Sequence, residues 1–256
     1  MEKFYGQIKI IREVTFMIDS IKNGENMNIL FLAPSGHGKT MLATILLHEL
    51  GGYNNSHIGI PPNFSFNPDV RFNMLDEVHE HRYPERLYKY MDEDMYTILL
   101  ATNEGGQLKE PLVNRCIQLM FEPYDQSDLI TIAKDALGGN AMGDSVINKV
   151  IEYSGGNPRE LKILIRRLKI VSKKKKIRTL NDLDTILDTV LNIDTRGLNV
   201  TARKYLDFLS SVGGRASLSL ISFGTGLDQA ALRRDVEPIL IQRGLIRISS
   251  KGRSVV

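Results

Sequence analysis

The sequence predicts a chain in three parts: an α/β domain with a parallel β-sheet, a small helical domain, and a C-terminal domain of three helices and a β-hairpin. Two observations lead to this prediction. Over residues 1–122, apolar runs of strand length alternate with helical patterns, which is typical of a parallel sheet with helices on both faces. From residue 123 the apolar spacing is helical up to the last strand-like segments. The predicted domains are therefore 1–122, 123–193 and 194–256.

The α/β domain contains alternating helices and strands. Glycine and asparagine set several of their ends, as at Asn23-Gly24 and Gly51-Gly52. The stretch 53–69 is rich in Asn, Pro and Gly, so we expect a loop with room for one short strand. The expected helices are 8–22, 41–50, 84–92 and 110–115, and the expected strands are 27–32, 70–75, 97–102 and 116–121.

The remainder of the chain is mainly helical. Gly138-Gly139 and residues 155–158 break the pattern, and two short strands are expected at 245–248 and 254–256. Three helices followed by a hairpin form the outline of a winged helix, which commonly binds duplex nucleic acid. The expected helices are 126–137, 144–154, 159–172 and 180–191, then 200–211, 216–223 and 228–242.

Residues 33–40 form a glycine-rich loop between a predicted strand and a predicted helix. Such a loop aims backbone N–H groups and the positive end of a helix dipole at one point, as a triphosphate requires. Lys39 should reach the β- and γ-phosphates, and the Thr40 hydroxyl should hold Mg²⁺. A plain strand-turn-helix connection is the alternative. We predict that ATP with Mg²⁺ binds the residues Pro34, Ser35, Gly36, His37, Gly38, Lys39 and Thr40.

An acidic pair follows the next predicted strand. Asp76 should lie beside Mg²⁺ with Thr40, and Glu77 should orient and polarise the attacking water. Acidic pairs are also common on protein surfaces. The position of this pair after a strand, downstream of a phosphate loop, favours a role in hydrolysis.

Three further polar residues are candidates for catalysis. Asn103 follows the strand 97–102 and could hold the water or the γ-phosphate, with Thr102 as second choice and a simple turn as the alternative. Arg115 could project into the nucleotide site of a neighbouring subunit, and Arg159 could reach the nucleotide of its own chain. Either arginine could instead form an ordinary surface ion pair.

Composition limits the class of protein. No apolar run reaches the roughly 18 residues of a membrane span, and no secretory segment opens the chain, so we expect a cytoplasmic protein without a membrane partner. Cys116 is the one cysteine and should pack as a small hydrophobic residue. The histidines show no metal-ligand spacing.

The charge is distributed unevenly. Residues 1–156 hold 13 Lys or Arg against 21 Asp or Glu, whereas residues 157–256 hold 20 against 9. This segregation indicates that the C-terminal part meets a polyanion. The lysine run at 173–176 could equally be a solvated helix end.

In this order the motifs resemble those of the AAA+ ATPases and, within them, the RuvB family of branch-migration motors. The segment 4–7 is similar to the family's adenine-side segment, which implies that Tyr5 and Gln7 contact the nucleotide. The segments similar to its Walker A, Walker B, arginine-finger and sensor 2 motifs are 33–40, 76–79, 111–115 and 156–159.

The most specific resemblance is C-terminal, where residues 235–246 and 251–253 are similar to that family's winged helix. It implies a hexameric ring that threads double-stranded or branched DNA and hydrolyses ATP between subunits. The implied DNA contacts, which would be salt-dependent contacts to phosphates, are Arg243, Arg247, Lys251 and Arg253.

The chain also departs from that family. About 19 residues separate Glu77 from Thr97, too few for the long hairpin with which RuvB docks on its partner RuvA. We therefore expect a partner protein other than RuvA, or a divergent one. An ATP-switched loader or recruiter acting on DNA, of the clamp-loader, helicase-loader or transposition-regulator type, is the alternative to a motor.

Overall fold

The computed structural model describes residues 4–62, 64–139, 142–172, 177, 179–194 and 196–256. The lysine run at 173–176 lies outside these residues. The chain divides into two compact units, Met1–Asp128 with Asn157–Arg159, and Leu129–Gly156 with Glu160–Val256. The domain boundaries at 122 and 193 remain predictions.

A five-stranded sheet forms the centre of the first unit. Its order is β2-β3-β4-β1-β5, and every neighbouring pair is parallel. The predicted parallel sheet is thus confirmed. Because β1 lies in the interior of the sheet, the loop after it emerges beside the ends of β3 and β4, at the edge where ligands of such sheets bind. The strands are β1 (Asn28–Leu32), β2 (Ser56–Gly59), β3 (Phe72–Leu75), β4 (Thr97–Thr102) and β5 (Ile117–Met120).

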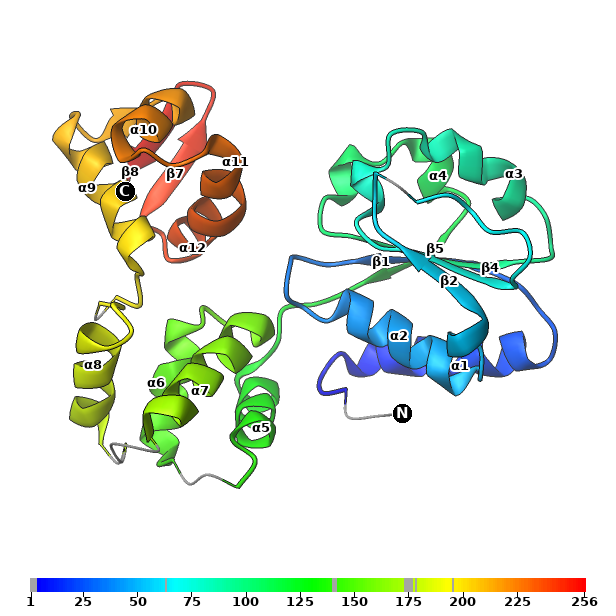
Figure 1. Cartoon of the computed structure of the whole chain (residues 1–256), viewed down its shortest axis with the longest axis horizontal. Helices are drawn as coiled ribbons and strands as arrows, with labels where there is room; N and C mark the ends of the chain where they lie inside the picture. Colours follow the sequence, from blue (N-terminus) through cyan, green and yellow to red (C-terminus); the bar gives the residue numbers. More distant parts are fainter. Residues whose placement is uncertain (1–3, 63, 140–141, 173–176, 178, 195) are drawn as a thin grey trace. The chain divides into compact units, whose positions relative to one another are not determined.

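Helices cover both faces of this sheet (Figure 1). Alternate residues of β1 explain the two layers: Ile29 and Phe31 pack with the buried residues of α1 and α2, and Leu30 packs with the cluster on the other side. β1 is therefore buried on both faces, as its continuous apolar run predicts. The helices are α1 (Ile8–Lys22), α2 (Lys39–Glu49), α3 (Tyr88–Met91) and α4 (Glu110–Val113).

Two stretches of the first unit differ in detail from a simple alternation. The loop-rich stretch 53–69 contains the short strand β2. Between β3 and β4, the expected helix over 84–92 is a 3₁₀ turn, Pro84–Leu87, followed by the single turn α3. A proline at the start of the 3₁₀ turn supplies no N–H, which suits the first turn of a helix. Short turns thus fill the segment between Glu77 and Thr97.

Cys116 packs on the α3 and α4 side of the sheet, as expected for a small hydrophobic residue. Its thiol donates to the Leu112 carbonyl at 3.3 Å. Burial raises the pKa of Cys116 to about 12. The thiol is therefore protonated at neutral pH.

The second unit is helical up to its C-terminal sheet. After helices α5 to α8, a three-stranded antiparallel sheet of order β6-β8-β7 packs with α9, α10 and α12. No helix in the described residues is long and apolar enough to cross a membrane. The elements are α5 (Gln126–Leu137), α6 (Asp144–Tyr153), α7 (Pro158–Ser172), α8 (Leu180–Thr189), α9 (Val200–Ser211), β6 (Arg215–Ala216), α10 (Leu218–Thr225), α11 (Gln229–Ala231), α12 (Glu237–Gln242), β7 (Ile246–Ser249) and β8 (Gly252–Val255).

Two predictions for the winged helix were wrong in detail. The helix expected from residue 216 begins at Leu218, because Ser217 caps it and Ala216 pairs with Arg253 in the sheet. The helix expected over 228–242 is interrupted by a π-helical stretch, Leu232–Val236. Pro238, two residues after this stretch, has no N–H to donate to the regular hydrogen-bond ladder.

Candidate nucleotide site

The loop at residues 33–38 connects β1 to α2. Gly36 and Gly38 have φ angles of 83° and 96°, in the left-handed region that disfavours other residues. A side chain at Gly36 would also collide with the amide of Asn157. Both glycines are therefore required by the path of the loop. The N-terminus of α2 follows at once, so its unpaired N–H groups and dipole lie beside the loop.

The side chain of Lys39, the first residue of α2, packs against the carbonyl groups of this loop. Its side chain is 5% exposed, and Nζ donates to the carbonyls of Ala33 at 2.8 Å and Pro34 at 3.3 Å. Burial lowers the pKa of Lys39, and the nearby Glu77 and Asp76 carboxylates oppose that shift. The ammonium group is thus held by the loop's own carbonyl oxygens, close to where the loop amides converge.

The two residues predicted to hold Mg²⁺ are in contact. The Thr40 hydroxyl donates to Asp76 Oδ2 at 2.6 Å, and Asp76 Oδ1 accepts from the Glu77 amide at 3.0 Å. A hydroxyl and a carboxylate are oxygen ligands of the kind that Mg²⁺ prefers, usually completed by phosphates and water. The described residues contain no cluster of three His, Cys, Asp or Glu able to hold a metal alone. The Thr40–Asp76 pair therefore fits Mg²⁺ that arrives with a nucleotide.

Glu77 follows Asp76 in a left-handed backbone conformation, with φ of 51° and ψ of 47°. Its Oε2 atom is buried and has no hydrogen-bond donor within the described part of the chain. Burial, followed by the charge of Asp76, raises the pKa of Glu77. A carboxylate with a free buried oxygen and a raised pKa is suited to accept a proton from water.

The end of β4 presents Thr102 and Asn103 differently. Thr102 is fully buried, and its hydroxyl oxygen lies 2.9 Å from His79 Nδ1 and accepts from the Glu104 amide at 3.0 Å. Asn103 is exposed. The role of Asn103 in holding the water or the γ-phosphate stays a prediction. The contact of Thr102 with His79 was not expected from the sequence.

Asn157 and Arg159, which belong to the first unit, bind the phosphate loop. Asn157 Nδ2 donates to the Ser35 carbonyl at 2.9 Å, and its Oδ1 accepts from the Arg159 amide at 2.9 Å. Arg159 Nη1 donates to the Ser35 hydroxyl at 3.3 Å. The structure thus brings the predicted Arg159 to the predicted loop.

Two aromatic residues pack near the same loop: Phe4, from the predicted adenine-side segment, and Tyr124, which the sequence did not single out. The ring of Phe4 lies against Gly38, and the Tyr124 hydroxyl donates to the His37 carbonyl at 2.9 Å. Burial raises the pKa of Tyr124 to about 12, so this donor keeps its proton. The position of Tyr124 in the sequence could have indicated this contact, because Tyr124 follows the end of β5 and β5 pairs with β1.

The predicted adenine-side residues lie in the same segment. Tyr5 is half-buried. Gln7 Nε2 donates to the Glu122 carbonyl at 2.6 Å, and Gln7 Oε1 accepts from the Glu122 amide at 3.0 Å. This pair of bonds ties the start of the chain to the end of β5. Nucleotide contact by Tyr5 and Gln7 remains a prediction.

Arg115 has partners next to α3 and α4. Its guanidinium binds both carboxylate oxygens of Asp92, at 2.8 Å and 3.1 Å, and lies 4.7 Å from the centroid of the Tyr88 ring. Arg115 Nη1 also donates to the Pro111 carbonyl at 2.9 Å. A role of Arg115 in another subunit stays a prediction, and it requires these contacts to be exchanged.

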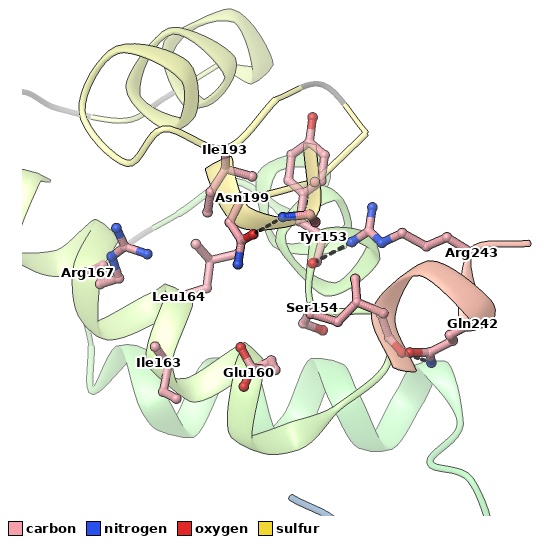
Figure 2. A pocket seen from close by; sticks show the side chains of 14 residues that line it. Tyr153, Ser154, Glu160, Ile163, Leu164, Arg167, Ile193, Asn199, Gln242 and Arg243 are labelled. Carbon is pink, nitrogen blue, oxygen red and sulfur yellow. Dashed lines mark hydrogen bonds between the residues drawn. The ribbon is translucent and has the colours of Figure 1, made fainter. Parts of the chain in front are cut away.

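The four predicted DNA contacts divide into two pairs. Arg247 on β7 and Lys251 in the following turn are exposed. Arg253 Nε instead donates to Glu237 Oε1 at 2.8 Å in a buried pair. Arg243 Nη2 donates to the Tyr153 carbonyl at 2.8 Å (Figure 2), and its Nε is buried without an acceptor among the residues described. Charge and position in the sequence do not distinguish these two pairs.

Figure 2 shows the pocket in the second unit that Arg243 borders, between α7, α12 and the segment before α9. Its volume is about 100 Å³, which suits a few water molecules rather than a nucleotide. Gln242 donates to the Gly155 carbonyl at one side of the pocket. The phosphate loop therefore remains the candidate nucleotide site.

The parallel sheet, the phosphate loop, the Asp76-Glu77 pair and an arginine that binds this loop define a P-loop ATPase of the AAA+ class. The family model of the RuvB C-terminal winged helix domain matches residues 195–256. Along nearly its whole length the chain is similar to RuvB, and its C-terminal winged helix matches the domain of that family.

Known relatives match almost the whole chain in sequence and in structure. The Holliday junction branch migration complex subunit RuvB of Fervidobacterium nodosum is 28% identical, over 99% of this chain and 84% of that protein. The same subunit from Lactobacillus gasseri is 26% identical, over 100% of this chain and 86% of that protein. The solved structure of the Thermotoga maritima RuvB Holliday junction branch migration motor is 27% identical, with a TM-score of 0.81 over 99% of this chain and 93% of that one.

Proposed function

We propose that the chain is an ATP-hydrolysing motor that forms a homo-oligomeric ring, a hexamer, and moves double-stranded or branched DNA in the cytoplasm. The observation that supports this most is the contact of Thr40 with Asp76 beside a loop that also holds Lys39 and Arg159. These are the groups needed to bind and cleave a triphosphate, and they occur in a chain that ends in a RuvB-type winged helix.

Binding would use the loop amides and two cations. Lys39 would exchange its bonds to the Ala33 and Pro34 carbonyls for phosphate oxygens, and Arg159 would act from its place beside Ser35. Thr40 and Asp76 would hold Mg²⁺. Bound there, the ion would neutralise part of the phosphate charge.

Hydrolysis would begin at Glu77. Its buried Oε2 can accept a proton from water, and Asn103 at the end of β4 would help to hold that water or the γ-phosphate. Arg115 would complete the site of a neighbouring subunit, after its bonds with Asp92 open. Such an arginine typically contributes about 10³ to 10⁵ in rate.

Contact with DNA would come from exposed cations of the winged helix. Arg247 and Lys251 are exposed near the hairpin turn, and within the described residues neither side chain has a hydrogen bond or ion pair to give up before it reaches a phosphate. Arg243 and Arg253 would have to give up such bonds, so we rank them second. Binding of this kind follows phosphates and is independent of base sequence.

The segment between Glu77 and Thr97 favours a second candidate function. It consists of short helical turns, Val78–Glu80, Pro84–Leu87 and Tyr88–Met91. A chain without a long projection there would use a partner other than RuvA, or a divergent one, and could act as an ATP-switched loader or recruiter on DNA.

The test is ATP turnover with and without DNA, together with movement of a four-way junction. We expect DNA to stimulate turnover, and Glu77→Gln to keep ATP binding while abolishing hydrolysis. The matched control is Glu80→Gln, the same change on an exposed residue of the next turn. Absence of DNA-stimulated turnover and of junction movement would refute the motor. Slow turnover with a stable ATP-bound complex on DNA would support the loader.

A further inference from the structure

We propose that His79 is a positioning residue for the hydrolysis reaction: it joins the Glu77 carboxylate to Thr102 at the end of β4 and so fixes the base that activates water. This inference rests on the proposed ATPase function and adds a residue to that site. His79 would link the acidic pair after β3 to Thr102 at the end of β4.

The backbone after β3 explains how His79 comes to this place. Glu77 adopts a left-handed conformation, and a 3₁₀ turn, Val78–Glu80, follows at once. The Glu80 amide donates to the Glu77 carbonyl at 2.9 Å, which closes the turn. Val78 is buried in the core on this side of the sheet and anchors it. The reversal brings the side chain of residue 79 back beside that of residue 77.

The contacts of the imidazole are polar on both ring nitrogens. Nδ1 lies 2.9 Å from Thr102 Oγ1 and 3.5 Å from Glu77 Oε2, and Nε2 lies 3.9 Å from Glu104 Oε1. The His79 side chain is 8% exposed, so bulk water does little to satisfy or screen these groups.

The proposed role requires the tautomer of His79 that carries its proton on Nδ1. With the proton on Nδ1, the N–H group faces both the Thr102 hydroxyl and the Glu77 carboxylate. Thr102 Oγ1 can accept from His79 and from the Glu104 amide at once, because a hydroxyl oxygen has two lone pairs. Since Glu77 Oε2 has no hydrogen-bonded donor in the described ranges, a small approach of this N–H would give it one.

The experiment compares three variants of the full chain by steady-state ATP turnover and by ATP binding. His79→Ala should lower kcat about 10- to 100-fold, as displaced catalytic groups typically do, while the dissociation constant for ATP changes less than about twofold. An asparagine amide reaches the position of Nδ1, whereas a glutamine amide reaches that of Nε2. His79→Asn should therefore recover most of the lost kcat, and His79→Gln should not.

Two further variants test the contact of His79 with Thr102. Thr102→Val removes the hydroxyl with little change in shape and should lower kcat, and Thr102→Ser, which keeps the hydroxyl, should recover most of the lost kcat. The matched histidine control is His81→Ala, whose ring contacts Phe64. We expect its kcat within about twofold of the original.

The outcomes separate this inference from the proposed function. Full turnover in His79→Ala, or equal turnover in His79→Asn and His79→Gln, would overturn the role of His79 and leave the ATPase intact. If the unaltered chain fails to hydrolyse ATP under all DNA and nucleotide conditions, both the proposed function and this role are refuted. The Asn and Gln variants remain informative even if His79→Ala does not fold.

Discussion

Replacing Arg253 with alanine should destabilise the winged helix rather than mainly weaken its contact with DNA. Arg253 Nε and Nη2 bind the two carboxylate oxygens of Glu237, at 2.8 Å and 3.3 Å, and the Tyr205 hydroxyl donates to the same carboxylate at 2.9 Å. The side chains of Arg253 and Glu237 are 14% and 4% exposed. The substitution therefore leaves a buried carboxylate without its cation.

Removing one partner of a buried ion pair typically costs about 3 to 5 kcal/mol. For a domain of about 60 residues, such as the winged helix, a loss of about 3 kcal/mol in the free energy of unfolding lowers Tm by roughly 12 °C or more. Thermal unfolding followed by circular dichroism measures the shift. Lys251→Ala, two residues away and exposed, is the matched control and should leave Tm within about 2 °C.

A double substitution isolates the pair. Arg253→Met combined with Glu237→Leu removes both charges and should recover part of the lost stability, because apolar replacements of buried pairs are often neutral, whereas the buried Tyr205 hydroxyl loses its acceptor. DNA affinity is then measured at a temperature at which every variant is folded. An unchanged Tm in Arg253→Ala, together with weaker DNA binding, would show that the reasoning is wrong and that this arginine serves DNA directly.

Three other predictions concern the site and the DNA-binding surface. Arg115→Ala and Glu77→Gln should each be inactive alone, and mixing them should restore turnover, because one interface then has both groups; an inactive mixture would contradict action between subunits. Arg247→Ala and Lys251→Ala should each reduce the slope of log affinity against log salt by about 0.9, and an unchanged slope would remove that residue from the interface. Because burial raises the pKa of Glu77 and the base must be ionised, kcat/KM should fall with decreasing pH through a value above the usual 4.5, and a limb at or below 4.5 would exclude Glu77 as its source.

Much of the first unit follows from local sequence pattern. The expected strand at 97–102 and helix at 8–22 have the observed bounds of β4 and α1, because an apolar run and an asparagine-glycine stop are local signals. The glycine-rich loop is likewise local. Its contacts with Asn157 and Arg159 are not local, since more than 100 residues separate them from Ser35; Arg159 was a candidate to reach the nucleotide, whereas Asn157 was not singled out.

The rest depends on contacts that no local pattern encodes. His79 and Thr102 are 23 residues apart, and their approach requires both the parallel pairing of β3 with β4 and the left-handed Glu77. The resemblance to a winged helix placed Arg253 among the expected DNA contacts, in a part of the chain that is rich in basic residues. A count of charges cannot tell an exposed arginine from one that is buried beside a carboxylate 16 residues earlier.

The protected state of Cys116 makes this chain convenient for fluorescence labelling. Maleimide dyes react with the thiolate, and burial, which raises the pKa of Cys116 to about 12, keeps its thiol protonated at pH 7. A single introduced cysteine, such as Lys251→Cys in the exposed turn, would therefore take up the dye selectively although the native cysteine is kept. Energy transfer between such labels can report subunit spacing in an assembled ring.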